Sequence, residues 1–345
     1  MKLGLQLGYW GAQPPVDALE KILEAERLGF DIVFTAESWG SDAFSPLAWW
    51  GASTGRIKLG TSIVQMSART PTSTAMHALT LDHLSGGRMV LGLGVSGPQV
   101  VEGWYGQPFA RPLARTREYV GIVRQVLARQ APVTSDGPHY PLPYHGPDSL
   151  GLGKALRPIV HPLRADVPIL LGTEGPKNVA LTAEIADGWL PLYYSPKAAR
   201  LYRSWLDEGF ARPGARRRAE EFEILPNCSV VVTDDREAVL TAMKPMLGFY
   251  IGGMGAKEMN FHKNLIARMG YEAEAQRVQD LFFEGRRDEA IAAVPSQMVA
   301  DISLVGTREQ IRDELPMWEE AGVTTLVVGA RSVAEMRTVA EVVLG

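Results

Sequence analysis

The sequence predicts an α/β protein built as a (β/α)8 TIM barrel. Three observations support this fold class: short β-rich apolar segments recur along the 345 residues, helical segments separate them, and no low-complexity linker divides the chain. Short strands alternating with helices are typical of a parallel sheet with helical crossovers, and eight such units close a barrel. We therefore expect residues 1–345 to form one domain rather than two.

Eight predicted strands follow one another in chain order: Leu3–Tyr9, Asp31–Glu37, Ile57–Gln65, Met89–Val95, Val167–Thr173, Gly188–Tyr193, Glu223–Val232 and Thr325–Gly329. The first crossover shows the helical pattern between strands. Four apolar residues at helical spacing predict its buried face: Val16, Leu19, Ile22 and Leu23. Gly29 is placed to end this helix just before the second strand.

Two segments are too long to be plain connectors. The first covers about residues 131–166, is rich in Pro and Gly, and contains His139 and His145. The second covers about residues 233–300 and contains two predicted helices around a glycine-rich hinge at residues 248–255. Insertions in a barrel usually decorate the carboxyl-end face of the strands, so we expect both to contribute to substrate specificity.

Composition and charge disfavour several classes of function. The chain has 35 Lys and Arg against 39 Asp and Glu, a balance that disfavours nucleic acid as a partner. No apolar segment approaches the roughly 18 residues of a membrane-spanning helix. The single cysteine, Cys228, lies in an apolar stretch and predicts a buried structural thiol. No metal-binding spacing of His or Cys is evident, and we expect a cytoplasmic protein that acts on a small molecule.

Two short motifs match known fingerprints in the wrong context. Residues 92–97 fit the dinucleotide pattern G-x-G-x-x-G, but the acidic residue expected about 20 positions later would fall inside a predicted helix. Residues 51–55 fit the nucleophile pattern G-x-S-x-G, but they lie between a helix and the next strand, the reverse of the required order. We therefore expect neither a Rossmann site nor a nucleophile at Ser53.

Residues able to bind a cofactor gather where the predicted strands end. Strand one ends at residues 8–11, strand two at 36–39 and strand four at 94–99, and these runs carry aromatic, hydroxyl and small side chains. Such a rim suits a flat heteroaromatic cofactor. Strand five leads through residues 172–176 into a helix beginning near Lys177, which suits a phosphate, although a plain tight turn with an exposed lysine has the same sequence features.

These segments resemble the F420-dependent branch of the luciferase-like oxidoreductases. The resemblance is carried mainly by residues 94–106, 115–119 and 175–189, and it extends over nearly the whole chain. It implies a TIM barrel that binds the deazaflavin coenzyme F420, transfers hydride to or from a small organic substrate, and forms a homodimer. Two alternatives stay open: an FMN-dependent monooxygenase supplied with reduced flavin by a partner reductase, and a barrel that binds a flavin without catalysis.

The resemblance also implies which residues contact the cofactor, and each set lies at the rim. In chain order these are Glu37 and Ser38 at the polar edge of the ring, Ser62, Ile63 and Val64 behind the ring, Val95, Ser96, Gly97, Gln99 and Val100 along the ring and ribityl chain, and Gly172, Glu174, Gly175, Pro176 and Lys177 around the phosphate. The segment behind the ring would include a cis peptide between Ser62 and Ile63.

Glu37 is the first candidate for the proton donor or acceptor. A carboxylate among aromatic groups can be tuned by desolvation to exchange a proton near neutral pH, although Glu37 can instead serve only to orient the ring. Several relatives carry His after this acid, whereas this chain has Ser38 and Trp39, which leaves the identity of the proton donor open. His139, His145 and Tyr193 are weaker candidates.

Overall fold

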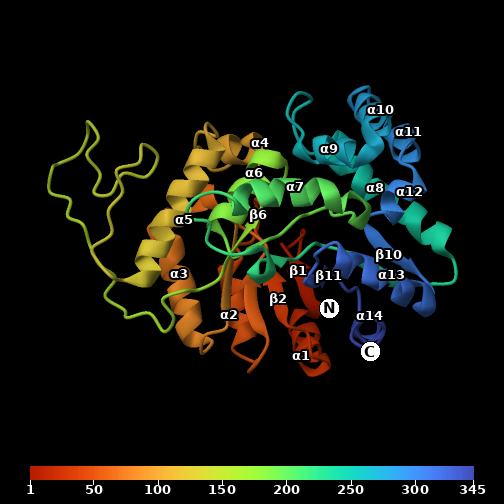
Figure 1. The fold of residues 1–345 in the computed structure, drawn as a ribbon, viewed down its shortest axis with the longest axis horizontal. Coiled ribbons are helices and arrows are strands. Elements are labelled where there is room, and N and C mark those ends of the chain that lie inside the picture. The colour runs from red at the N-terminus through yellow and green to blue at the C-terminus, as the bar shows by residue number, and fades with distance from the viewer.

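The computed structural model describes residues 1–345 and confirms the (β/α)8 barrel (Figure 1). The parallel barrel strands are hydrogen bonded in the order β11-β1-β2-β3-β5-β6-β7-β8. Their bounds are β1 (Lys2–Gly8), β2 (Ile32–Thr35), β3 (Lys58–Thr61), β5 (Met89–Gly94), β6 (Ile169–Gly172), β7 (Gly188–Trp189), β8 (Glu223–Ile224) and β11 (Thr325–Val328). The backbone N–H of Val327 donates to the Pro226 carbonyl at 2.9 Å, which closes the ring between β8 and β11.

Nine helices in the barrel crossovers surround the strands: α1 (Ala18–Leu28), α2 (Phe44–Gly51), α3 (Pro71–Leu84), α4 (Pro98–Gly103), α5 (Pro112–Ala128), α6 (Pro176–Ile185), α7 (Ala199–Phe210), α13 (Arg308–Glu320) and α14 (Val333–Val343). Helix α1 ends at Gly29, whose φ of 87° confirms the predicted cap. Of its predicted buried face only Ile22 is buried, because the helix buries Ala18 and Ala25 instead. Val16, Leu19 and Leu23 are exposed. The small side chains of Ala18 and Ala25 let α1 approach the strands closely, but they do not stand out in a pattern of large apolar residues.

The second insertion forms a separate helical layer after β8. Strands β9 (Ser229–Val232) and β10 (Ser303–Gly306) pair in parallel outside the barrel, and five helices lie between them: α8 (Arg236–Gly252), α9 (Phe261–Ile266), α10 (Glu272–Phe283), α11 (Arg287–Ala292) and α12 (Ser296–Ala300). Figure 1 shows these helices gathered on one side of the barrel. The prediction of a hinge at residues 248–255 is wrong for residues 248–252, because α8 continues to Gly252 and Gly248 is buried within the helix.

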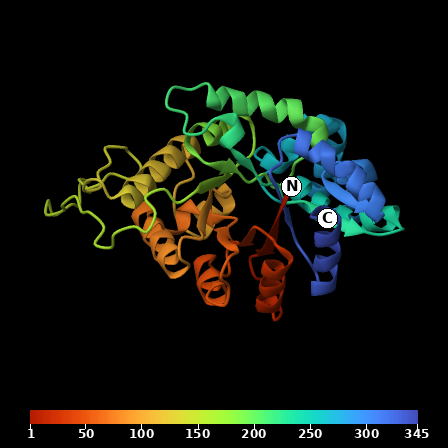
Figure 2. The same cartoon turned by 60° about the horizontal axis from the view of Figure 1, so that its bottom comes forward.

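The first insertion has no helix or strand and projects away from the barrel (Figures 1 and 2). It leads from α5 to β6, so it leaves and re-enters the barrel at the amino ends of the strands. There the Arg164 guanidinium donates to the Met89 carbonyl at 2.7 Å. Its first half runs back toward the rim, where the backbone N–H of Tyr140 donates to Glu118 at 3.1 Å. The expectation of a catalytic-face insertion therefore holds here only around Tyr140.

The hydrophobic core fills the barrel and the layer between strands and helices. A second buried cluster lies within the helical insertion, and partly buried Tyr193 and Met269 pack against both clusters. Because the two clusters are connected through these side chains, we propose that the chain forms a single domain. Cys228 is buried and free, as its apolar surroundings predict. No helix in the structure combines the length and apolar character needed to cross a bilayer.

Candidate active site

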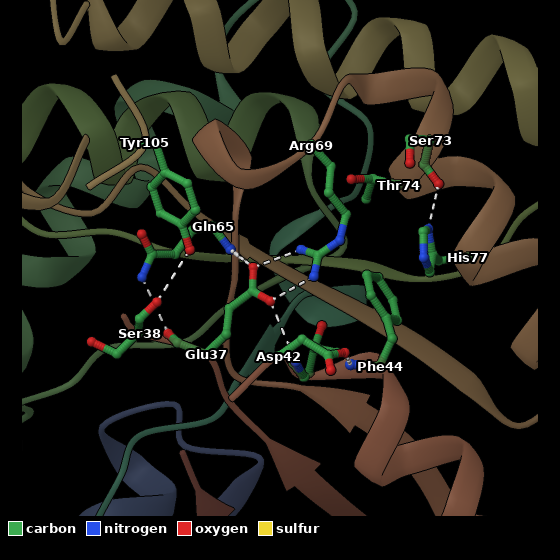
Figure 3. A network of polar contacts seen from close by, with 12 residues as sticks. Glu37, Ser38, Asp42, Phe44, Gln65, Arg69, Ser73, Thr74, His77 and Tyr105 are labelled. Carbon is green, nitrogen blue, oxygen red and sulfur yellow. Dashed lines mark hydrogen bonds and ion pairs between the residues drawn. The ribbon is translucent and has the colours of Figure 1, made fainter. Parts of the chain in front are cut away.

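Glu37 lies buried just beyond β2, and four hydrogen-bond donors surround its carboxylate (Figure 3). Arg69 donates from Nη1 to Oε1 at 2.8 Å and from Nη2 to Oε2 at 3.0 Å. The backbone N–H groups of Gln65 and Ala43 donate at 2.8 and 3.3 Å. A carboxylate offers about four acceptor positions, so this set engages all of them. The geometry favours the orienting role of Glu37 over a role in proton transfer.

Arg69 is itself held in a specific environment. Its guanidinium lies 5.2 Å from the centre of the Phe44 ring, and its carbonyl accepts from the Tyr119 hydroxyl at 3.2 Å. Burial lowers the pKa of Arg69, but its hydrogen bonds and attraction to Glu37 outweigh this and raise the pKa above its ordinary value. The pair therefore ties the loop after β2 to the segment that precedes α3.

The segment from β3 to β4 (Val64–Gln65) contains the cis peptide between Ser62 and Ile63 that the resemblance implied. The Ile63 side chain packs against the ends of β5 and β6: a Cβ added to Gly94 or Gly172 would lie 2.9 or 2.8 Å from Ile63. Beside it, the buried Oε1 atoms of Gln6 and Gln65 have no hydrogen-bond partner. An apolar platform flanked by unused acceptors fits a flat ring that carries N–H donors.

The loop after β5 forms another side of the rim. Ser96 adopts a left-handed conformation with φ of 60°, and Gly97 is the N-cap residue of the short helix α4. Val95 lines a small cavity with Phe109 and Tyr140. Of the predicted contacts here, Val95, Ser96, Gly97 and Val100 are partly buried, whereas Gln99 is exposed. Across the rim, the Tyr105 hydroxyl donates to the Ser38 carbonyl at 3.1 Å, so the loops after β5 and β2 are joined (Figure 3).

The turn after β6 has the features of an anion site. Gly175 has φ of 82° and ψ of 160°, a conformation that favours glycine, and helix α6 begins at Pro176 with no side chain capping its amino end. Lys177 is exposed beside this end. Glu174, predicted near the phosphate, instead directs its carboxylate to His262, with 2.9 Å between Oε1 and Nδ1. The open amides and Lys177 fit a phosphate, whereas the Glu174 carboxylate does not.

Sequence reasoning missed two groups at the rim. Arg69 directly precedes Thr70, which caps α3, and a charged residue in the loop after strand three was a signal that it reaches the catalytic face. His262 lies in the second insertion and had no local signal. Of the weaker candidates, His139 packs beside Glu118 of α5, and His145 is exposed in the first insertion.

Known proteins match this chain over nearly its whole length. A Mycobacterium tuberculosis protein named "Putative coenzyme F420-dependent oxidoreductase" is 63% identical over 343 residues, covering 99% of both chains. The solved structure of coenzyme F420 dependent tetrahydromethanopterin reductase from Methanopyrus kandleri matches with a TM-score of 0.79 at 23% identity, covering 99% of this chain and 98% of that one. An F420-dependent secondary alcohol dehydrogenase in complex with an F420-acetone adduct matches with a TM-score of 0.76 at 18% identity and the same coverage.

The two structural matches establish the shared fold. The family model described as luciferase-like monooxygenase matches residues 4–325, which include the barrel strands from β1, without its first two residues, to β8, and the first residue of β11. The site described above lies wholly within this span. The chain therefore belongs to the luciferase-like monooxygenase family.

Proposed function

We propose that this protein is a coenzyme F420-dependent oxidoreductase that transfers hydride between the deazaflavin and a small organic substrate, either an alcohol or carbonyl compound or an activated C=C or C=N bond. The observation that carries the cofactor is the 63% identity over 99% of the chain to the Mycobacterium tuberculosis protein named for F420. The rim supports it, because the platform, Gln65 and the anion turn lie at the ends of the neighbouring strands β3 to β6. Gln6 of β1 is linked to the platform through its side-chain amide, which donates to the Ser62 carbonyl.

The residues at the rim suggest how the cofactor would be held. Ile63 and Val95 would cover the apolar ring, and the unpaired oxygens of Gln6 and Gln65 would accept hydrogen bonds from its edge. The amino end of α6 and Lys177 would hold the phosphate. When bound, the deazaflavin supplies or accepts hydride at its ring carbon, while the protein positions the substrate and provides the partner for the proton.

Anaerobic turnover tests this proposal against its alternatives. We expect the protein to reoxidise reduced F420 in the absence of oxygen when a carbonyl compound or activated alkene is added. The recovery of the absorbance of oxidised deazaflavin measures this reaction. Oxygen uptake with reduced FMN, and no anaerobic reaction, would instead identify a monooxygenase. Binding of F420 without turnover on any member of a broad substrate panel would identify a non-catalytic barrel.

Replacing Gly175 with Asp should weaken F420 binding, because a carboxylate at the start of α6 opposes a phosphate there. The φ of 82° means that any side chain at this position strains the backbone, so Gly175→Ala is the matched control. No atom lies within 4 Å of an added Cβ, so the two variants differ mainly in charge. We expect Gly175→Asp to bind F420 about tenfold more weakly than Gly175→Ala in a fluorescence titration. Equal affinities would remove this turn from the cofactor site.

We also propose that the protein forms a homodimer and is located in the cytoplasm. Large apolar side chains are exposed along the first insertion, among them Leu150, Leu152 and Ile159. Large apolar side chains left exposed together in one segment often belong to a protein interface, which supports the homodimer that the family resemblance implies. The homodimer and the cytoplasmic location stay predictions.

A further inference from the structure

His262 reaches the rim from the second insertion and is paired with an acid from the barrel. Its Nδ1 lies 2.9 Å from Oε1 of Glu174, which lies two residues beyond the end of β6. The side chains of His262 and Glu174 are only 21% and 10% exposed, so the pair is largely shielded from water. A histidine oriented by a carboxylate through one ring nitrogen presents the other nitrogen for proton exchange.

Two tyrosines fix the orientation of the His262 ring. Tyr250 of α8 lies edge-on with ring centres 4.9 Å apart, and Tyr193, beyond β7, lies edge-on at 6.1 Å. Burial raises the pKa of Tyr193 above its ordinary value, and burial together with Tyr9 raises the pKa of Tyr250 to about 12. Both phenols therefore stay neutral near physiological pH, and they frame the imidazole rather than compete with it as acids.

Backbone anchoring holds His262 over the barrel. The side-chain amide of Asn260 donates to the carbonyls of Tyr250 and Ile251 at 2.9 and 2.8 Å, and its Oδ1 accepts from the backbone N–H of Lys263 at 2.8 Å. This starts α9 and ties it to α8. The neighbouring Phe261 ring lies 6.4 Å from Phe109, which follows α4 at the rim. His262 thus lies beside Glu174 after β6 and Tyr193 beyond β7, and its neighbour Phe261 lies beside Phe109, which lines the same cavity as Val95.

We propose that His262 is the proton donor and acceptor of the reaction and that Glu174 is its positioning residue. This rests on the proposed function. With Nδ1 engaged by Glu174, Nε2 is the ring nitrogen without a hydrogen-bond partner. In the reduction of a carbonyl group, the Nε2–H of protonated His262 would supply the proton to the carbonyl oxygen, and bound reduced F420 would supply the hydride to the carbonyl carbon. The imidazole would then be left neutral and would take up a proton from water.

Glu37, the first candidate for this role, is already engaged by other groups. All the acceptor positions of Glu37 are occupied, so that carboxylate has none left for a substrate. The chain also lacks a histidine next to Glu37, where Ser38 and Trp39 stand instead. A histidine delivered by an insertion from another part of the chain would supply the missing acid.

Three variants test the proposal. His262→Gln keeps a hydrogen bond to Glu174 but removes the titrating ring, and we expect turnover to fall by about 10²–10⁴ while F420 affinity is retained. His262→Ala should lose as much turnover and regain part of it when imidazole is added to the buffer. His83→Gln is the control, because His83 is exposed on α3 and bonds only the His161 carbonyl; its turnover should match that of the wild type.

A measurement without turnover checks the pair itself. With ¹⁵N-labelled histidine, the wild-type protein should show a slowly exchanging Nδ1–H resonance that disappears in His262→Gln and in Glu174→Ala. Absence of that resonance in the wild type would overturn the pairing. Undiminished turnover in His262→Gln, or a loss of F420 affinity as large as the loss of turnover, would also overturn the proposal. If the wild type neither binds nor turns over F420, the proposed function fails, and the histidine proposal fails with it.

Discussion

Replacing Glu37 with Gln should destabilise the protein by about 3 kcal/mol, because it breaks a buried ion pair by removing one charge. All four partners of the Glu37 carboxylate are donors: two guanidinium nitrogens of Arg69 and the backbone N–H groups of Gln65 and Ala43. A glutamine amide places an NH2 group against at least one of them and leaves the Arg69 charge without its partner. Both effects raise the free energy of the folded state.

Denaturant unfolding of the wild type and of Glu37→Gln measures this effect, with Glu20→Gln as the control. Glu20 is exposed on α1, and we expect its substitution to change the free energy of unfolding by less than about 0.5 kcal/mol. If Glu37→Gln keeps full stability and F420 affinity but loses turnover by about 10²–10⁴, Glu37 acts as the proton donor and the orienting role is wrong.

Replacing Gly92 with Ala should cost more than about 3 kcal/mol, since the barrel has no room for a side chain at this position. An added Cβ would lie 1.8 Å from the Thr61 carbonyl oxygen and 2.9 Å from the Leu190 side chain. The Thr61 oxygen belongs to the neighbouring strand, so relief requires β3 and β5 to separate. The same Gly92 opens the dinucleotide-like run 92–97, and close strand packing explains why glycine stands there.

Gly121→Ala is the matched control for this substitution. Gly121 lies within α5, and no atom lies within 4 Å of an added Cβ. Alanine there should raise the free energy of unfolding by about 0.5–1 kcal/mol, because it restricts the unfolded chain and favours the helix. Soluble expression and thermal unfolding of the two variants give the comparison. Equal stability of Gly92→Ala and the wild type would contradict the observed packing of β3 against β5.

The barrel could be predicted because most of its strands lie in apolar runs bounded by helical or turn signals. Strand β10 was not predicted, since residues 303–306 form a short run whose only strand partner is β9, at a distance in sequence that no local pattern records. The segment 223–232 was predicted as one strand, whereas the structure divides it between β8 in the barrel and β9 outside. Backbone pairing decided both differences, and pairing is a tertiary property.

The sequence predicted the site residues that lie at strand ends, but not the side chains with which these residues form hydrogen bonds. Glu37 stands where the end of the second strand required, and the turn at Gly175 precedes a helix as expected. The partner of Glu37 is Arg69, 32 residues away, and the partner of Glu174 is His262, 88 residues away. Such pairings depend on which loops the closed barrel brings together, so the sequence pattern alone does not specify them.

A fluorescence titration of the purified protein with F420 and, separately, with FMN tests the central claim most directly. The rim and the full-length similarity to a protein named for F420 predict that the deazaflavin binds more tightly than FMN. Micromolar affinity for FMN with no measurable affinity for F420 would contradict the cofactor assignment and identify the chain as a flavin-binding member of its family.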